Sequence, residues 1–204
     1  MSINESLRTA LKKRTIIADG AMGTMIQAAD PSLEDFEGLE GCNEILNVSR
    51  PDIIKEVHRK YLSVGCDAIE TNTFGANFAN LAEYGIPDRI YELAYAGGKI
   101  AKEVTEEFSE KKWVLGSIGP GTKLPTLGHI EFEQLRQTYF QCAKGLVDAG
   151  VDGLLIETAQ DLLQAKAAVI AAREAIDKAE RDVVLIVQVT VETTGTMLLG
   201  SEIR

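Results

Sequence analysis

Residues 150–158 read Gly-Val-Asp-Gly-Leu-Leu-Ile-Glu-Thr, and residues 65–71 read Gly-Cys-Asp-Ala-Ile-Glu-Thr. Both stretches begin with a glycine of the kind that ends a helix, continue through an apolar run and finish in Ile-Glu-Thr. The later copy has two more residues. Each copy predicts a helix that stops and a buried strand that ends in a carboxylate, so this weak echo indicates a repeated helix–strand unit.

Three further apolar runs, 16–20, 113–118 and 183–189, raise the number of predicted strands to five. Near-continuous apolar strands of this length are typical of a buried parallel sheet. Because strands and helices alternate along the chain, the fold class is α/β. Five strands would complete an open sheet, whereas a full (β/α)8 barrel needs about 250 residues, and the pattern alone leaves both open.

The helical segments between the strands have recognisable boundaries. Ser49-Arg50-Pro51-Asp52 has the form of a capping box, and it predicts a helix that runs to Gly65. Segment 131–149 carries one apolar face, whose residues recur at spacings of three and four: Phe132, Leu135, Tyr139, Cys142 and Leu146. The segment from Asp161 is expected to bury a similar face of Leu162, Leu163, Val169 and Ile170.

Composition restricts the class of protein. Hydrophobic residues make up 45% of the 204 residues, and the formal net charge is −10. This charge repels phosphate backbones and anionic membranes, so we expect no nucleic-acid or membrane partner. No run approaches the ~20 apolar residues of a membrane span, and the start at Met1 lacks the features of a secretory signal, which predicts a cytoplasmic protein.

Polar residues gather where the predicted strands end. Asp19 ends the first strand, Glu70-Thr71-Asn72 the second, Ser117 the third and Glu157 the fourth. The carboxyl ends of parallel strands share one rim, where ligands bind in barrels and open sheets alike. Carboxylates that converge there would bind the ammonium group of an amino acid. A strand-end carboxylate can equally be a helix cap or a solvated turn residue.

Backbone groups beside Asp19 complete the predicted site. The N–H groups of Gly20 and Ala21 would bind the carboxylate of the amino acid, because a chain that turns into a helix exposes unpaired donors. The long Gly- and Pro-rich loop 119–129 lacks a phosphate-loop motif and is expected to form a lid or a wall.

The histidines and cysteines offer little chemistry. We expect His58 to be a surface or packing residue, and His129 could contact a ligand from its loop. Cys42, Cys66 and Cys142 are too scattered to converge on a metal ion, and without a signal peptide they are expected to be reduced thiols.

Five stretches resemble the homocysteine S-methyltransferases, and the second of them is most similar to the cobalamin-dependent methionine synthase branch of that family. They cover essentially the whole chain in order: Asp19–Thr24, Glu70–Asn77, Gly116–Pro125, Ile156–Leu162 and Thr194–Ile203. The resemblance implies a (β/α)8 TIM-type barrel of which residues 1–204 hold only about the first five β/α units.

The resemblance also implies a chemistry. Family members bind homocysteine on a zinc ion held by three cysteine thiolates, and the homocysteine thiolate takes a methyl group from methylcobalamin to give methionine. Methyltetrahydrofolate recharges the cobalamin, and separate folate- and cobalamin-binding domains are the implied partners. Residue by residue, the resemblance implies that Asp19 and Glu157 bind the ammonium group of homocysteine, and that the Gly20-Ala21 backbone and Thr71 lie by its carboxylate.

The family's zinc cysteines come later than Arg204, so we assign no catalytic residue and no metal ligand, and we expect this chain alone to be inactive. One alternative is a non-catalytic truncated binding or interaction module that pairs through an open sheet edge. Another is a homocysteine methyltransferase with betaine or S-methylmethionine as donor, which the motif at 70–77 disfavours. A phosphate-handling barrel enzyme is disfavoured by the acidic rim.

Overall fold

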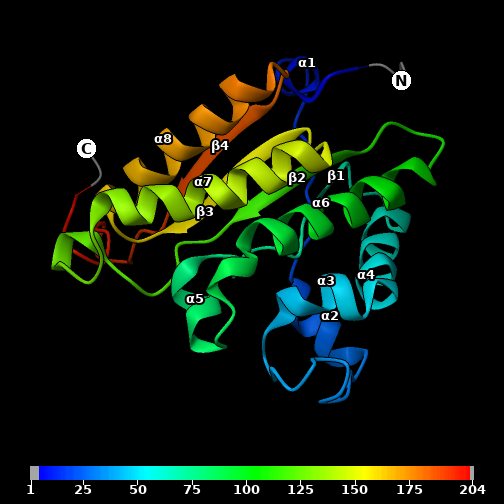
Figure 1. Cartoon of the computed structure of the whole chain (residues 1–204). Helices are drawn as coiled ribbons and strands as arrows, with labels where there is room; N and C mark the ends of the chain where they lie inside the picture. Colours follow the sequence, from blue (N-terminus) through cyan, green and yellow to red (C-terminus); the bar gives the residue numbers. More distant parts are fainter. Residues whose placement is uncertain (1–4, 203–204) are drawn as a thin grey trace.

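The computed structural model describes residues 5–202 (Figure 1). Two predictions involve residues outside this range. The absence of a secretory signal concerns the start at Met1, and the last family-like stretch ends at Ile203. The helices and strands are α1 (Leu7–Leu11), α2 (Met22–Ala28), α3 (Leu46–Ser49), α4 (Pro51–Ser63), β1 (Ala68–Glu70), α5 (Phe78–Glu83), α6 (Ile90–Glu106), β2 (Trp113–Ile118), α7 (Phe132–Ala149), β3 (Gly153–Ala159), α8 (Leu162–Ala179) and β4 (Val184–Val189). Three 3-10 turns complete the set: η1 (Asn43–Ile45), η2 (Pro87–Arg89) and η3 (Pro125–Leu127).

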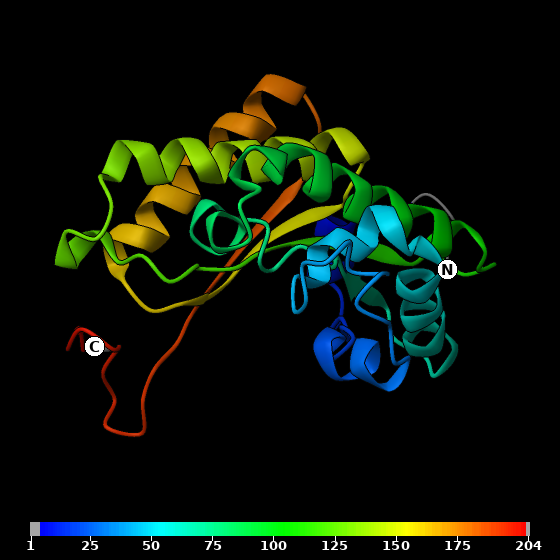
Figure 2. The same ribbon diagram turned by 60° about the horizontal axis from the view of Figure 1, so that its bottom comes forward.

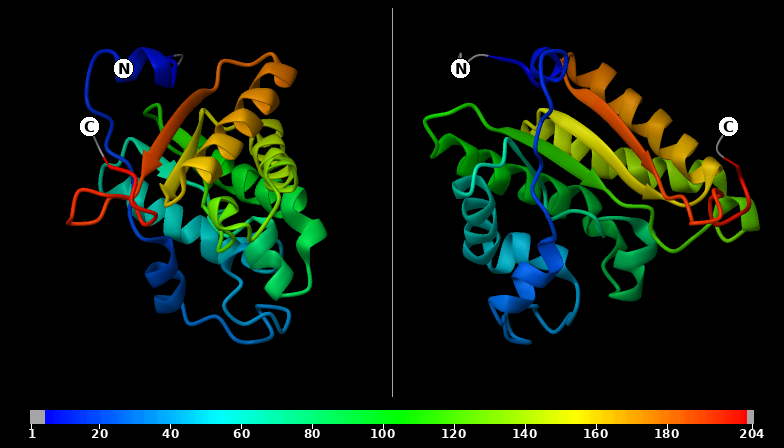
Figure 3. Two further views of the ribbon diagram at one scale, coloured as in Figure 1. Left: turned by 90° about the vertical axis from the view of Figure 1, so that its left-hand side faces the viewer. Right: turned by 180° about the vertical axis from the view of Figure 1, so that it is seen from behind.

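The four strands form one parallel sheet in the order β1-β2-β3-β4. Helices α6, α7 and α8 lie side by side on a single face of it (Figures 1 and 3). An open doubly wound sheet would reverse its strand order and carry helices on both faces. Sequential parallel strands with one outer helix layer are the wall of a (β/α) barrel, so the predicted barrel class is confirmed and the open sheet is rejected.

The predicted first strand is only partly correct. Within 16–20 the chain makes an isolated parallel bridge between Ala18 and Ala68, beside β1 and in the position expected of a first strand. It does not continue as a strand because side chains take over the pairing: the Asp67 carboxylate accepts the Ile17 N–H at 2.9 Å, and the Asp19 carboxylate accepts the Glu70 N–H at 3.0 Å.

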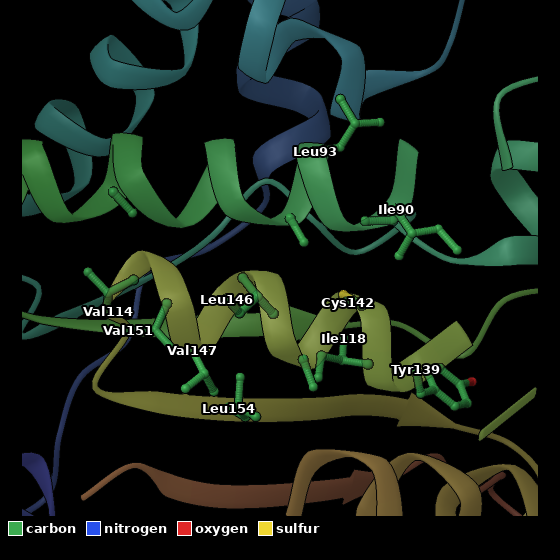
Figure 4. Packing of buried hydrophobic residues seen from close by; sticks show 14 of the residues in the cluster. Ile90, Leu93, Val114, Ile118, Tyr139, Cys142, Leu146, Val147, Val151 and Leu154 are labelled. Carbon is green, nitrogen blue, oxygen red and sulfur yellow. The ribbon is translucent and has the colours of Figure 1, made fainter. Parts of the chain in front are cut away.

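The main core lies between the sheet and its outer helices (Figure 4). The predicted face of α7 is confirmed, since Leu135, Tyr139, Cys142 and Leu146 are buried and Phe132 packs against the cluster. For α8 the prediction was wrong. Leu162, Leu163 and Ile170 are exposed and Val169 is only half-buried, while the buried face is made mostly of small residues: Ala165, Ala167, Ala168, Ala171, Ala172 and Ala175. Alanine permits the close approach of α8 to its neighbours, which larger side chains would prevent.

A second, smaller cluster occupies the opposite face of the sheet, the face that would be the barrel interior. Leu7 and Ala10 of α1 pack on Trp113, Leu115 and other inward residues near the starts of the strands. Seen from behind, the N-terminal segment crosses this face while the outer helices lie beyond the sheet (Figure 3). Helix α1 therefore closes the amino end of the sheet, and the carboxyl end is left for the site.

Two local predictions on α4 are settled by hydrogen bonds. The capping box is absent: Ser49 donates to the Ile45 carbonyl, Asp52 pairs with Arg50, and the cap residue Arg50 contributes no side-chain cap bond. His58 is a packing residue, with no exposed surface, and neither of its ring nitrogens has a hydrogen-bond partner. Burial lowers its pKa to about 4, so the ring is neutral at physiological pH.

Beyond β4 the chain leaves the sheet as an extended segment (Figure 2), which bends back through an antiparallel bridge between Thr196 and Glu202. None of the helices within residues 5–202 is long and apolar enough to span a bilayer.

Candidate functional site

A cavity of about 460 Å³ opens at the carboxyl ends of β1, β2 and β3. Glu70 pairs with Leu115 of β2, and Ser117 pairs with Leu155 of β3. Because residues two apart on a strand point to the same side, Ser117 lies on the same side as Glu70, and Glu157 on the same side as Ser117. The segment after the bridge at Ala18 and the turn η1 provide the other walls. The lining residues are Gly20, Ala21, Met22, Gly23, Asn43, Glu44, Glu70, Thr71, Asn72, Phe74, Ser117 and Glu157.

The carboxyl groups of Glu44, Glu70 and Glu157 line this cavity, and Asp19 adjoins it through its bond to the Glu70 N–H. Burial, reinforced by the charges of Glu70 and Glu157, raises the pKa of Asp19 to about 7. Burial and the charge of Glu157 raise the pKa of Glu70 to about 7. Glu70 and Glu157 both line the cavity and Asp19 bonds to the Glu70 backbone, so the strand-end carboxylates lie close together as predicted. No lysine or arginine is among the residues that line the cavity, so the site has a surplus of negative charge.

Asp19 stands slightly behind the cavity wall. One carboxylate oxygen, Oδ1, accepts the Glu70 N–H, whereas Oδ2 is buried without a hydrogen-bond partner. The carboxyl of Glu70 likewise makes no hydrogen bond within the described residues. The Glu70 carboxyl, which lines the cavity, is therefore available to a donor that the chain itself does not provide, whereas Asp19 Oδ2 is unpaired but closed to solvent.

Thr71 and Ser117 belong to a closed hydrogen-bond network. The Thr73 hydroxyl donates to the Ser117 carbonyl at 2.7 Å, so in the 2.6 Å contact between Thr71 and Thr73 the Thr71 hydroxyl must be the donor. The Thr71 oxygen in turn accepts the Ser117 N–H at 3.0 Å. Because its only proton is already used, Thr71 has no side-chain donor left for a carboxylate, although it lines the cavity as expected.

Asn72 is also engaged in holding the wall. Its amide donates to the Asn43 carbonyl at 2.7 Å and to the Asn47 side chain at 3.0 Å, and Asn47 donates back to the Asn72 carbonyl. These bonds attach the end of β1 to the turn η1. They explain how Asn43 and Glu44, far from any strand in sequence, reach the cavity.

Glu44 was not among the predicted site residues. Its side chain is buried, its Oε1 accepts the Gly75 N–H at 2.7 Å, and burial raises its pKa. Gly75 is needed here because a Cβ at that position would lie 2.6 Å from the Glu44 carboxylate. Nothing in the local sequence around Glu44 signals this contact, which depends on the η1–β1 packing.

The predicted backbone donors lie at the cavity. Gly20 and Ala21 line it, and no acceptor within the described residues takes the N–H of either. Tyr61 fixes this turn, because its hydroxyl donates to the Ala21 carbonyl at 3.0 Å and would lie 3.2 Å from a Cβ at position 20. The two N–H groups can therefore donate hydrogen bonds to a ligand.

The long loop after β2 is held by hydrogen bonds, and none of its residues lines this cavity, so its expected role as a lid or wall stays a prediction. Tyr139 and Gln164 both donate to the Pro120 carbonyl, and Asp161 accepts from the backbone and hydroxyl of Thr126. His129 accepts the Leu124 N–H within the loop and does not line the cavity.

The cysteines are buried and separate. Burial raises the pKa of Cys42 to about 11 and that of Cys142 to about 12, and it also raises the pKa of Cys66, so all three are protonated thiols. Across residues 5–202, no group of three or more His, Cys, Asp or Glu side chains is placed to hold a metal ion. The described side chains therefore do not fit a thiolate zinc site.

The chain is similar over nearly its whole length to two mycobacterial methionine synthases. Methionine synthase of Mycobacterium tuberculosis is 55% identical to the chain, and that of Mycobacterium leprae is 54% identical. Each alignment covers 97% of the chain and 17% of the relative, so the chain spans about a sixth of the length of these proteins.

The fold has solved counterparts. The metallated form of the homocysteine methyltransferase MmuM from Escherichia coli superimposes with a TM-score of 0.75 at 22% identity, covering 96% of this chain and 70% of that one. Its apo form gives a TM-score of 0.69. At this identity the likeness concerns the fold alone. The model of the family described as homocysteine S-methyltransferase matches residues 16–204, and the chain therefore belongs to that family.

Proposed function

We propose that the cavity binds the amino-acid portion of homocysteine, and that the chain takes part in the transfer of a methyl group to the homocysteine sulfur to give methionine. The observation that carries this proposal is the meeting of Asp19, Glu70 and Glu157 beside the unpaired N–H groups of Gly20 and Ala21. An α-amino acid presents an ammonium group and a carboxylate side by side, which is the complement of that arrangement.

Each predicted residue has a role in this proposal. Glu157 and Asp19 bind the ammonium group, and Glu70 adds negative charge beside them. The Gly20 and Ala21 N–H groups bind the carboxylate. Thr71 and Asn72 shape the cavity wall without donating a side-chain hydrogen bond to the ligand, because their side-chain donors are already used inside the protein.

The methyl donor and the metal are the finer part of the proposal. The high identity to methionine synthases supports methylcobalamin, recharged by methyltetrahydrofolate, as the donor rather than betaine or S-methylmethionine. Zinc does not fit the described side chains, so no step is assigned to it here. We propose that these groups, with the folate- and cobalamin-binding domains, belong to other parts of a longer protein. On this view the present chain binds and orients homocysteine but does not methylate it.

Homocysteine binding is the direct test, measured by following amide resonances of the chain during titration. We expect saturable shifts at Gly20, Ala21 and Glu157. Glu157→Gln should weaken binding by at least about tenfold, the effect of losing a hydrogen bond to a charged group. Glu34→Gln makes the same change at an exposed residue outside the cavity and should have no effect.

Two results would contradict the proposal. Unchanged affinity in Glu157→Gln would remove the ammonium site from this cavity. Conversion of homocysteine to methionine by the isolated chain, supplied with zinc and methylcobalamin, would refute the expected inactivity.

A further inference from the structure

Ser117 and Glu157 form the shortest polar contact at the cavity. The Ser117 hydroxyl donates to Glu157 Oε1 at 2.5 Å, and both residues line the cavity. Ser117 retains only 2% of its surface, whereas Glu157 is half-buried and reaches the open space. The hydroxyl therefore lies behind the carboxylate and holds it from the protein side.

The direction of this hydrogen bond follows from its surroundings. The Ser117 backbone is fixed on both sides, because its carbonyl accepts the Thr73 hydroxyl and its N–H donates to Thr71. Both threonines bond to the Ser117 backbone, and the proton of the Ser117 hydroxyl goes to Glu157. Glu157 thus has one oxygen committed to an internal donor and the other left for a ligand.

We propose that Ser117 is a positioning residue that makes Glu157 the carboxylate selective for an ammonium group. This inference rests on the proposed function. Glu70, the acid beside it in the cavity lining, lacks such a donor, because its carboxyl makes no hydrogen bond within the described residues. Asp19 has one in the Glu70 N–H, but Asp19 is not among the residues that line the cavity. A donor to a carboxylate oxygen fixes the rotamer of the side chain, so Ser117 holds Glu157 in the position from which its free oxygen meets the ligand.

A ligand that lacks the amino group separates this role from a merely structural one. We would measure the affinities of homocysteine and of 4-sulfanylbutanoate, which keeps the carboxylate and the thiol, for the full chain and for Ser117→Ala. Homocysteine should bind about five- to tenfold more weakly to Ser117→Ala, and 4-sulfanylbutanoate should bind equally to both. Ser117→Thr keeps the hydroxyl and should restore homocysteine affinity. Equal losses for both ligands would overturn the proposal.

A double-mutant cycle tests whether Ser117 acts through Glu157. In the Glu157→Gln background, Ser117→Ala should cause no further loss of homocysteine affinity, and additive losses would refute the coupling. If Ser117→Ala does not fold, Ser117→Cys keeps a weaker donor and should give an intermediate affinity. Wild-type affinity in Ser117→Cys would contradict the proposal.

A ligand-free measurement distinguishes failure of this inference from failure of the proposed function. The side-chain carboxyl 13C resonance of Glu157 should move in Ser117→Ala and return in Ser117→Thr. If it moves while homocysteine binds nowhere, the proposed function fails and the coupling stands. If Glu157→Gln weakens homocysteine binding and Ser117→Ala does not, only the inference about Ser117 fails.

Discussion

Replacing His58 by leucine should stabilise the fold, and the gain should grow as the pH is lowered. His58 lies on α4 with no exposed surface, and neither ring nitrogen has a partner. An unsatisfied buried polar group costs about 1–3 kcal/mol, which a leucine of similar volume does not incur. We therefore expect the free energy of unfolding to rise by about 1–3 kcal/mol at pH 7.5.

The pH dependence has a definite sign. The folded pKa of about 4 lies below the ordinary value of 6.5, so between these values the unfolded chain binds a proton that the folded chain does not. The histidine then destabilises the fold by about 1.4 kcal/mol for each pH unit below 6.5. At pH 5 this adds about 2 kcal/mol to the difference between His58→Leu and the wild type.

Urea unfolding followed by fluorescence measures this difference, because the single tryptophan, Trp113, is fully buried. Titrations at pH 7.5, 6 and 5 compare the wild type with His58→Leu, and His129→Leu controls for loss of an exposed histidine. The raised pKa values of Asp19 and Glu70 act in the opposite direction, but they are common to all three proteins and cancel in the difference. A gap that stays constant from pH 7.5 to pH 5 would refute the reasoning.

Two other predictions concern the cavity. Gly75→Ala places a Cβ 2.6 Å from the Glu44 carboxylate and should lower the free energy of unfolding, measured by urea unfolding, by about 1–3 kcal/mol. Gly85→Asn is the control. It should change the free energy of unfolding far less, because Gly85 has a left-handed backbone, which asparagine tolerates, and open space around it. Homocysteine binding at pH 7 should release protons, because a bound ammonium group lowers the raised pKa values of Asp19 and Glu70. Calorimetry in buffers of different ionisation enthalpy measures this release, and affinity should rise from pH 6 to pH 8; proton uptake or falling affinity would contradict the assignment.

The sequence predicted the fold best where the apolar pattern of a segment was compatible with only one kind of element, a helix or a strand. The β-branched run at 183–189 and the five-residue face of segment 131–149 lie where they were expected. The prediction for α8 failed because residue size was used as the guide. The tightly packed face of that helix is built from alanines, while Leu162 and Leu163 remain exposed.

The residues of the candidate site also differ in whether the sequence could predict them. Strand-end residues such as Glu70 and Glu157 could be predicted, because parallel strands bring their carboxyl ends together whatever the details of packing. Asn43 and Glu44 could not, since they reach the cavity through hydrogen bonds to Asn72 and Gly75 that only the folded chain establishes. Ser117 was visible as a strand end, but its bond to Glu157 depends on the β2–β3 register.

The hydrogen bonds of the cavity wall sort its polar groups into two classes. Thr71, Asn72 and Ser117 use their donors inside the protein, so a ligand gains little from them. The groups left over are acids and two backbone N–H groups. Acids without partners at neutral pH weaken the fold, and they lose this cost only when a donor arrives. A ligand that offers donors to the acids and acceptors to the N–H groups must carry a positive and a negative group close together, which is why we propose a free amino acid, rather than a phosphate or a simple amine, as the ligand of this cavity.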